Sequence, residues 1–599
     1  MKRTSIGPTW QEAKATLLRF PAVLVCGALA AAVSIHHFND RAGGDRPMQR
    51  VMVLALGIPL FFALRLWQER PPWRRPLSRA AVGGSLLAAA ALLVLYRHWL
   101  RHETGDASWL RYFQLTLAVD LAVAIAPFLG RGETNGFWQF NRRLFQRFFL
   151  SGIYATVFFA GLALAILAVD HLFDVKVNPS LYPRLWFFTV FVFLPWHFLA
   201  GVPRDLAGLE GDREHPKALR IFSQSLLVPL VGLYVAILYG YTAKILVTRQ
   251  WPQGWVGWLV SFASGFGVLT ILLLQPGRGD PERRWVDRFA RGFHAAILPL
   301  LGLLFAALGK RVGQYGVTEK RYWLFILGAW LVGIALFMLF RRAPSIKAVP
   351  ATLALLALVT SFGPWGAFQV SLRSQTRRLE ALLSRHGLLA SGTLRPSAAE
   401  VPNGDVKEIS AVVDYLASYH GPAPLDRLMR DPAPPGRARP WKNGQDIREA
   451  FMGEMKLTYL RPWEDEASPD TDSFHPAEDG REVAGYESLY DCYFMRKTEG
   501  MPTVRYWCRF DEHGRAVEIL RGPEVLLTMP VAPLLQRLAT ATSGAVPAAD
   551  LCVTGGDDRL RAKACFLTLN IRNDDAGARA AWTGNGYVLI DEHPTKEVR

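Results

Sequence analysis

One carboxylate in this sequence stands at a position where a charge is costly. Asp120 lies near the middle of an apolar stretch that covers residues 108–129. A charged side chain at that depth in a membrane is expensive, and such residues often mark ion or proton pathways. Asp120 is therefore a candidate intramembrane polar site for a proton or cation relay. A structural hydrogen bond to a neighbouring helix, helped by Thr116 or Gln114, explains this residue equally well.

Acidic and basic side chains also gather where a second apolar stretch ends. Asp170 and Asp174 are four residues apart, with His171 beside the first of them, so the two carboxylates share one helical face. Together with Arg321 they form a candidate outer-face cluster that can bind a cation or perform acid–base chemistry. An ordinary polar helix terminus explains the same residues.

The first loop offers a further set of polar groups, namely His36, His37, Asp40 and Asp45. Membrane glycosyltransferases that use polyprenyl-phosphate donors often carry an acidic catalytic residue in this loop. That alternative rests on architecture alone, and the loop is short for such an enzyme. The sequence contains no phosphate-binding glycine loop, no G-x-S-x-G and no H-E-x-x-H. An enzymatic activity is therefore not the favoured interpretation, and no catalytic residue can be named.

The cysteines are distributed unevenly along the chain. Cys26 is the single cysteine of residues 1–371, and the remainder holds Cys492, Cys508, Cys552 and Cys565. Four cysteines allow three pairings, between which sequence cannot choose. We favour Cys492–Cys508 with Cys552–Cys565, since each bond closes a short loop. A zinc site needs ligand pairs at C-x2-C-like spacing, which do not occur, so we expect disulfides and no metal or cofactor.

The elements that must position these residues are mostly apolar helices. A membrane-spanning helix needs about 20 predominantly apolar residues, and about eleven stretches qualify. They lie near residues 17–36, 49–67, 79–96, 108–129, 148–171, 183–202, 221–246, 255–275, 290–308, 322–340 and 347–370. The sequence thus predicts a membrane all-α helical bundle over residues 1–371.

The basic residues predict how this bundle is oriented. Residues 1–371 hold 39 Lys and Arg against 18 Asp and Glu. With a cytoplasmic N-terminus, 25 of these 39 fall in inner segments, as the positive-inside rule requires. Arg19 and the charged segment before it argue against a cleaved signal peptide. Eleven crossings then place the polar tail in the periplasm, an oxidising space that suits its four cysteines.

Residues 372–599 have the pattern of one soluble α+β domain. It begins with an amphipathic helix over 371–389, which can lie along the membrane surface. A helix over 405–419 follows. Further elements are predicted as strands over 490–495, 504–510, 515–520, 562–571 and 587–591, a helix over 531–541, a hairpin turn at Glu499-Gly500, and a turn at 584–586.

Composition excludes some binding functions. The sequence pI is about 9.8, which can indicate nucleic-acid binding. Here the excess of positive charge lies wholly in the apolar half. Lys and Arg beside membrane helices face anionic lipid. We therefore expect the lipid bilayer, with anionic phospholipid at the cytoplasmic loops, as a partner, and no nucleic acid.

Three motifs at helix ends carry a resemblance to a known family. They are Phe137-Trp138-Gln139-Phe140-Asn141-Arg142-Arg143-Leu144, Tyr315-Gly316-Val317-Thr318-Glu319-Lys320-Arg321-Tyr322, and Gly363-Pro364-Trp365-Gly366 with Ser371-Leu372-Arg373-Ser374-Gln375 and Arg378-Leu379 after it. In these motifs the chain resembles the bacterial multi-pass membrane proteins catalogued as domain of unknown function 4153. The resemblance implies the membrane architecture, and it supplies no activity, cofactor or catalytic residue.

The second motif also has a physical interpretation. Thr318 is placed to cap the helix that follows it, and Gly316 allows a left-handed turn. Arg321 is expected to anchor that helix at the level of the lipid headgroups, and a headgroup or ligand contact by Arg321 is the alternative.

The function that fits these features is that of an inner-membrane protein with a periplasmic C-terminal domain, acting as a cell-envelope scaffold, sensor or interaction protein that contacts a periplasmic protein. A transporter that uses Asp120 and a polyprenyl-phosphate-dependent glycosyltransferase are the alternatives.

Overall fold

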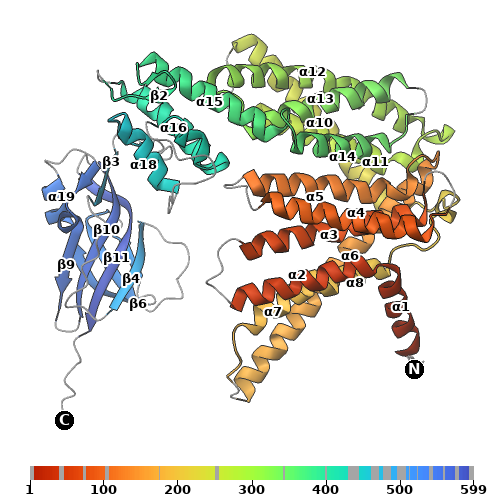
Figure 1. Ribbon diagram of the computed structural model, residues 1–599, viewed down its shortest axis with the longest axis horizontal. Helices are drawn as coiled ribbons and strands as arrows, with labels where there is room; N and C mark the ends of the chain where they lie inside the picture. The colour runs from red at the N-terminus through yellow and green to blue at the C-terminus, as the bar shows by residue number, and fades with distance from the viewer. Residues whose placement is uncertain are drawn as a thin grey trace. The chain divides into compact units, whose positions relative to one another are not determined.

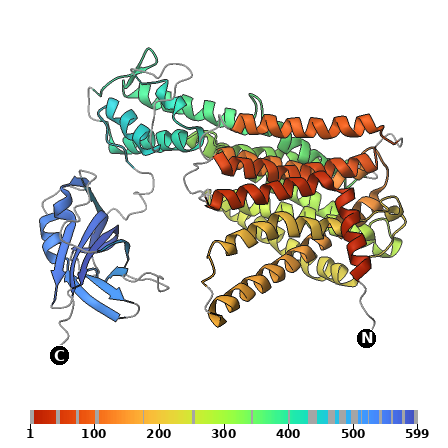
Figure 2. The ribbon, with the colours of Figure 1, turned by 60° about the horizontal axis from the view of Figure 1, so that its bottom comes forward.

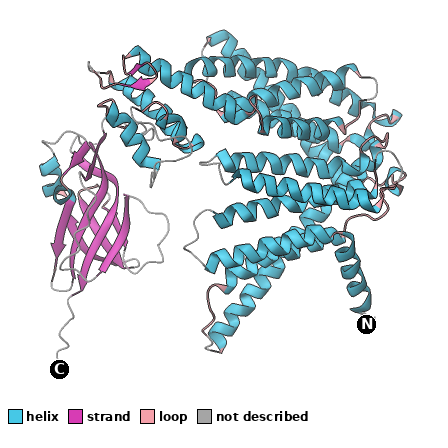
Figure 3. Ribbon diagram, viewed as in Figure 1, coloured by secondary structure: helices cyan, strands magenta, loops and turns pink. Residues whose placement is uncertain are grey.

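The computed structural model describes most of the chain and divides it into two compact units, Met1–Leu460 and Arg461–Arg599. The first is almost entirely helical and the second is rich in strands (Figure 3). The described residues are 6–39, 46–71, 76–100, 107–173, 176–249, 255–341, 344–397, 401–429, 444–460, 471–476, 488–495, 507–511, 513–521, 524–538, 544–557, 560–573 and 579–592.

The first unit is a bundle of long helices, most of which run roughly parallel to one another (Figures 1 and 2). Its first helices are α1 (Ile6–Arg19), α2 (Pro21–Asn39), α3 (Arg46–Glu69), α4 (Arg79–Leu100), α5 (Ala107–Ile125), α6 (Thr134–Leu172), α7 (Leu181–Phe188) and α8 (Leu194–Ala200). The following ones are α9 (Lys217–Ile221), α10 (Val228–Thr248), α11 (Trp255–Leu273), α12 (Arg284–Tyr315), α13 (Glu319–Phe340), α14 (Ala348–Ser361) and α15 (Ala367–Arg385).

Each of the eleven predicted apolar stretches coincides with a helix. In the described part of the chain, nine helices are long and apolar enough to cross a membrane, and the segments Gly257–Leu273 and Ala348–Ser361 are shorter. Two of the nine contain a π-helical turn, at Thr189–Phe193 and Phe222–Leu227. A proline lies two residues after the end of each turn, Pro195 after the first and Pro229 after the second. Its missing N–H interrupts the regular ladder of helical hydrogen bonds.

Contacts between loops define one end of the bundle, which we call the α1 end. Arg19, at the end of α1, forms an ion pair with Glu69 at 2.8 Å and donates to the carbonyl oxygen of Val202 at 2.9 Å. Arg131 donates to the carbonyl oxygen of Pro71 at 2.9 Å, and Lys347 donates to the carbonyl oxygen of Arg131. Segments far apart in the sequence therefore meet at the α1 end.

The opposite end of the bundle, the α15 end, collects the other loops. The ring of Trp99 lies 5.8 Å from that of Phe362, centroid to centroid. Gln49 donates to the carbonyl oxygen of Leu100 at 3.2 Å, and Gln375 of α15 donates to that of Tyr315 at 3.0 Å. The chain thus enters the bundle at the α1 end, before α2, and leaves it at the α15 end, after α14.

The last predicted span is shorter in the structure than the predicted range 347–370. Helix α14 has 14 residues, a rise of about 21 Å, whereas a hydrocarbon core is about 30 Å thick. The helix stops at Ser361 because Gly363 adopts φ +80° and Pro364 has no N–H to donate. A new helix, α15, begins at Ala367.

Helix α15 is the predicted amphipathic helix, but its apolar face packs on protein. Leu379, Leu382 and Leu383 are buried in a core shared with α16 (Asn403–His420) and α18 (Gly444–Glu454). The expectation that this face lies on the membrane surface was wrong, because the neighbouring helices cover it. The short elements of this region are β1 (Leu389–Ala390), β2 (Thr393–Leu394) and α17 (Ala423–Asp426).

The predicted tail therefore splits between the two units. Helices α15 to α18 belong to the first unit, and the boundary between the units follows Leu460. The sequence predicted that the membrane bundle ends at residue 371 and the soluble domain begins at 372. This boundary stays a prediction.

The second unit consists of two mainly antiparallel sheets and a helix. Its elements are β3 (Thr471–Pro476), β4 (Ser488–Met495), β5 (Trp507–Phe510), β6 (Ala516–Arg521), β7 (Glu524–Pro530), α19 (Ala532–Leu538), β8 (Gly544–Val546), β9 (Cys552–Gly556), β10 (Leu560–Asn573) and β11 (Arg579–Glu592). The larger sheet has the order β4-β11-β10-β3-β8 with β9 also on β10, and the smaller has β5-β6-β7. Side chains of both sheets and of α19 form one apolar core.

Two details of this unit differ from the prediction. Strand β4 pairs with β11 and β5 pairs with β6, so the predicted hairpin strands lie in different sheets. The expected turn at 584–586 is instead part of β11. A Cβ on Gly586 would come within 2.0 Å of the carbonyl oxygen of Cys565. The glycine therefore allows two strands to approach closely, beside a register shift at Phe566/Thr568.

Candidate functional site

The second family-like motif forms the turn between α12 and α13. Gly316 ends α12 with φ +69°, so the predicted left-handed turn is confirmed. Thr318 has the extended backbone of an N-cap, but its side chain makes no capping hydrogen bond, so that prediction was wrong. Arg321 instead donates to the carbonyl oxygens of Tyr315 at 3.1 Å and Gly316 at 2.8 Å. It satisfies acceptors that a helix end leaves free.

Helix α15 inserts polar side chains into this turn. Gln375 donates to the carbonyl oxygens of Tyr315 at 3.0 Å and Val317 at 3.1 Å. The hydroxyl of Ser374 accepts the backbone N–H of Val317 at 2.9 Å, and Arg378 donates to Tyr315 at 3.0 Å. The third motif thus binds the second one through polar side chains of α15.

Beneath the turn lies a buried acid with three partners. Glu319 is 1% exposed. Its Oε1 accepts the hydroxyl of Ser371 at 2.6 Å and lies 3.2 Å from Nε2 of His420. Its Oε2 accepts the hydroxyl of Tyr415. Burial, the charge of Glu319 and this hydrogen bond raise the pKa of Tyr415. We call Glu319, Ser371, Tyr415 and His420 the Glu319 cluster.

The Glu319 cluster has the residue types of a serine nucleophile with its base and acid, but a different geometry. In that mechanism the acid binds one ring nitrogen of the histidine and the serine binds the other. Here Nε2 of His420 faces both Glu319, at 3.2 Å, and Ser371, at 3.4 Å. Ser371 is also fully buried. The cluster therefore joins α13, α15 and α16 and presents no accessible nucleophile.

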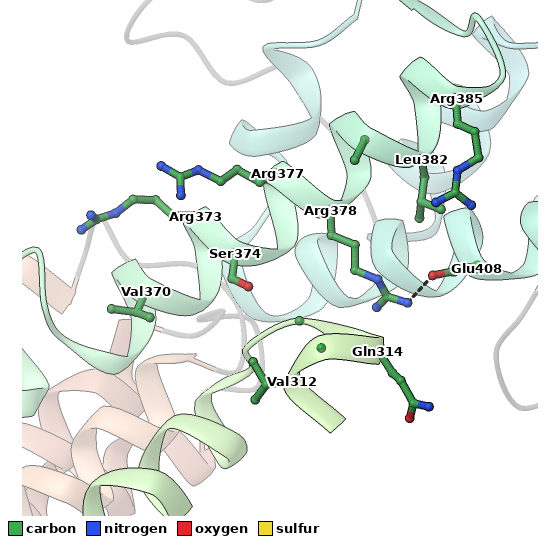
Figure 4. A pocket seen from close by; sticks show the side chains of 13 residues that line it. Val312, Gln314, Val370, Arg373, Ser374, Arg377, Arg378, Leu382, Arg385 and Glu408 are labelled. Carbon is green, nitrogen blue, oxygen red and sulfur yellow. Dashed lines mark hydrogen bonds and ion pairs between the residues drawn. The ribbon is translucent and has the colours of Figure 1, made fainter. Parts of the chain in front are cut away.

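Next to this cluster, α15 and the last turn of α12 border an open pocket of about 580 Å³, which we call the arginine pocket (Figure 4). Glycines and apolar side chains form part of its wall, including Gly313, Val370 and Leu382. Four arginines of α15 line it, namely Arg373, Arg377, Arg378 and Arg385, and Glu408 of α16 is its single acidic residue.

The positive charge of the arginine pocket is only partly neutralised. Arg378 forms an ion pair with Glu408, and Arg373 donates to the carbonyl oxygen of Pro364. Arg377 and Arg385 are exposed, and within the described residues neither has a recorded hydrogen bond or ion pair. Such a surface, with free guanidinium groups and one acid, suits an anion.

A second cavity of about 560 Å³ adjoins the first and shares Arg373 with it. Aromatic rings make up much of its wall. The guanidinium of Arg111 lies 3.8 Å from the ring centre of Trp99 and 4.2 Å from that of Phe368. Arg111 is itself buried, so these rings stabilise its charge by cation–π attraction.

The structure places Asp120 on the surface of α5. Its side chain is exposed and lines neither described cavity. Gln114 donates to Thr360 at 2.6 Å and Thr116 donates to Tyr112 at 2.9 Å, so neither of the expected partners binds the carboxylate. Within the described residues no hydrogen bond or ion pair of Asp120 is recorded. Its role as a polar site stays a prediction.

The residues of the predicted outer-face cluster are not all brought together by recorded contacts. Asp170 accepts the backbone N–H of Val177 at 2.9 Å and lies 3.4 Å from His171. Arg321 binds the α12 turn instead, and Asp174 lies outside the described residues. Asp40 and Asp45 of the first loop also lie outside them. In the described parts of the chain no group of three His, Cys, Asp or Glu is placed to hold a metal ion.

One of the two favoured disulfides is present. Cys552 and Cys565 form a bond between the adjacent strands β9 and β10. Cys508 is also in a disulfide, whereas the side chain of Cys492 lies outside the described residues. Cys26 is a free, buried thiol.

Comparison with known families decides where this chain belongs. The model of a family described as a domain of unknown function, number 4153, matches residues 51–381, which is more than half of the chain. The chain belongs to this family. The match confirms the resemblance drawn from the three motifs and includes both ends of the turn that α15 binds.

One relative of the family domain is an uncharacterized protein of Pasteurella multocida (strain Pm70). It is 24% identical to the chain over 394 residues, and the match covers 63% of each protein. The chain thus spans 63% of the length of this relative. No solved structure matches the chain.

The first motif of the family domain organises the α1 end. Asn135, two residues before the motif, donates to the carbonyl oxygens of Glu210 at 2.9 Å and Asp212 at 2.6 Å, and Gln139 of the motif donates to that of Asp212 at 3.0 Å. Arg143 forms an ion pair with Asp212 at 2.6 Å. Burial acts to raise the pKa of Asp212, but the backbone N–H of Glu214 and the charge of Arg143 outweigh it, so this pKa is lowered. The motif therefore fastens the loop before α9.

Sequence reasoning missed one polar pair in the family domain and two partners of Glu319 that lie beyond it. Ser151 and Nδ1 of His197 lie 2.7 Å apart between α6 and α8. Among the described residues no acid pairs with this histidine, and Ser151 is fully buried, so the pair is a helix-to-helix contact. Tyr415 and His420 were also missed as partners of Glu319. Glu319 stands at the start of an apolar helix, and a carboxylate buried at such a position needs a hydrogen-bonding partner. This was the signal in the sequence that could have indicated these contacts.

Proposed function

We propose that this chain is an integral inner-membrane protein whose N-terminus is cytoplasmic and whose residues 461–599 lie in the periplasm. In this proposal it serves the cell envelope as a scaffold, sensor or interaction protein. One observation carries the proposal: the chain enters the helical bundle at the α1 end and leaves it at the α15 end. The segments after α15 then lie on the side opposite the N-terminus.

Charge and sulfur chemistry support the same orientation. The α1 end carries Arg19, Arg70, Arg131 and Arg143, which fits a cytoplasmic surface by the positive-inside rule. There these cations are expected to face anionic phospholipid. The Cys552–Cys565 bond in the second unit fits an oxidising compartment.

A non-enzymatic role is favoured by how the polar groups are used. Glu319, Ser371 and His420 bind one another below the surface. A transporter would need Asp120 to face a polar cavity, and its side chain is on the surface of α5. No observation favours a polyprenyl-phosphate-dependent glycosyltransferase, since Asp170 and Arg321 have different partners.

A reporter that is active only outside the cytoplasm tests the orientation when it is fused after Arg599. The proposal predicts an active fusion, and an identical reporter placed in the loop at Arg213 should be inactive. Activity only at Arg213 would overturn the proposal.

Co-purification in mild detergent tests the interaction role. The full chain should retain a periplasmic protein that a chain truncated after Leu460 does not retain. Equal retention by both chains would show that the second unit is not the contact.

A further inference from the structure

We propose that the arginine pocket binds the phosphate group of an anionic membrane lipid at the α15 end. This goes beyond the scaffold role, and it differs from the expected lipid contacts at the α1 end. The proposal rests on the shape of the pocket, on its unpaired charges, and on the apolar surface beside it.

The shape of the pocket suits a headgroup. Its volume of about 580 Å³ is within the range of small-ligand sites, about 300–1,000 Å³. At Gly313, which lines it, an added Cβ would meet nothing within 4 Å. The wall contributed by α12 is therefore open at this point, and a group can approach the backbone closely.

The charge of the pocket selects an anion. Arg377 and Arg385 project from α15 on the same helix as Arg378, and only Arg378 is engaged by Glu408 (Figure 4). Guanidinium groups donate in pairs to phosphate oxygens. Figure 4 shows Arg377 and Arg385 at different points along α15, so a phosphate at either one would supply the counter-charge that Glu408, which is paired with Arg378, does not.

The surroundings of the pocket suit a lipid. The aromatic side chains of Tyr315 and Trp365 are 47% and 59% exposed, at the end of the bundle where such residues sit in membrane interfaces. Leu355 and Leu358 are exposed on α14, the helix that precedes α15 in the chain. Acyl chains can lie along this apolar surface while the phosphate is held by the arginines.

The α1 end differs in this respect, although it is also rich in arginine. Several of its cations are paired within the protein, as in Arg19–Glu69, Arg70–Glu133 and Arg143–Asp212. General attraction to anionic lipid is expected there, whereas the arginine pocket combines free guanidinium groups with an open hollow of about 580 Å³.

Native mass spectrometry of the purified full chain tests the site, with phosphatidylglycerol as the probe and phosphatidylcholine as the neutral reference. The double variant R377Q/R385Q should bind phosphatidylglycerol at least tenfold more weakly than the unmodified chain. The matched control K320Q/R395Q removes two exposed charges that do not line the pocket, and it should bind within about twofold of the unmodified chain. The variant G313L fills the pocket while it keeps every charge, and it should also lose binding.

Each other outcome contradicts the proposal. Equal losses in R377Q/R385Q and K320Q/R395Q would show diffuse attraction rather than a site. Unchanged binding by G313L would show that the pocket is not used, and this variant decides the matter if the double variant fails to fold. If glycerol phosphate displaces the lipid at equal concentration, the ligand is a soluble phosphate compound and the lipid assignment is wrong.

Discussion

Replacement of Glu319 by alanine should release α16 from the helical bundle. The substitution removes the acceptor of three hydrogen bonds, from Ser371 at 2.6 Å, from His420 at 3.2 Å and from Tyr415. Hydrogen bonds to a charged group contribute about 1.5–3 kcal/mol each. Because the three bonds share one carboxylate and their contributions do not add in full, we expect a loss of about 4 kcal/mol in the docking of α16.

Hydrogen exchange of the α16 backbone amides measures this loss directly. About 4 kcal/mol corresponds to roughly a thousandfold fall in protection. The control E408A breaks a partly exposed pair with Arg378, which is worth about 0.2–1 kcal/mol, so protection should fall by at most about fivefold. E319Q keeps one acceptor oxygen, so the protection of α16 in this variant should lie between that in E319A and that in E408A. If E319A lowers the protection of α16 no more than E408A does, the reasoning about the Glu319 cluster is refuted.

Three further predictions follow from the contacts. The pKa of Tyr415 is raised in the folded chain, so the stabilising effect of its hydroxyl is complete below the unfolded pKa of about 10 and is lost as the pH rises above that value. Helix α16 should therefore open at alkaline pH, which proteolysis measures. The variant Y415F should show no such pH dependence. C552A/C565A should lower the free energy of unfolding of residues 461–599 by about 3 kcal/mol, seen as a lower urea midpoint in pulse proteolysis; an unchanged midpoint counts against it. N135A removes one of the donors that hold the loop before α9, so protease should cut this loop faster in inside-out vesicles, whereas T134A should behave like the unmodified chain.

The helices of the bundle were predictable because their signal is local. An apolar stretch of sufficient length satisfies its own backbone only as a helix, and all eleven stretches proved helical. The limits of α14 were not predictable by the same rule. Its apolar residues continue past Ser361, and the break depends on the backbone of Gly363 and on Pro364.

The candidate site depends on distant partners, which a single sequence does not reveal. Glu319 meets Ser371 and His420, which are 52 and 101 positions away. Arg377 and Arg385 lie in the segment predicted only as an amphipathic helix over 371–389, since nothing local shows that the end of α12 forms a pocket with them. Asp120 was assigned from its depth alone, and its surroundings could not be deduced.

The central claim is that the chain crosses the membrane an odd number of times before α15. Single cysteines at exposed positions test it most directly, with Ser384 on α15 and Arg213 at the α1 end. In intact spheroplasts, a membrane-impermeant maleimide should label S384C at once and R213C only after the membrane is broken. Labelling of both variants, or of R213C alone, would contradict the account.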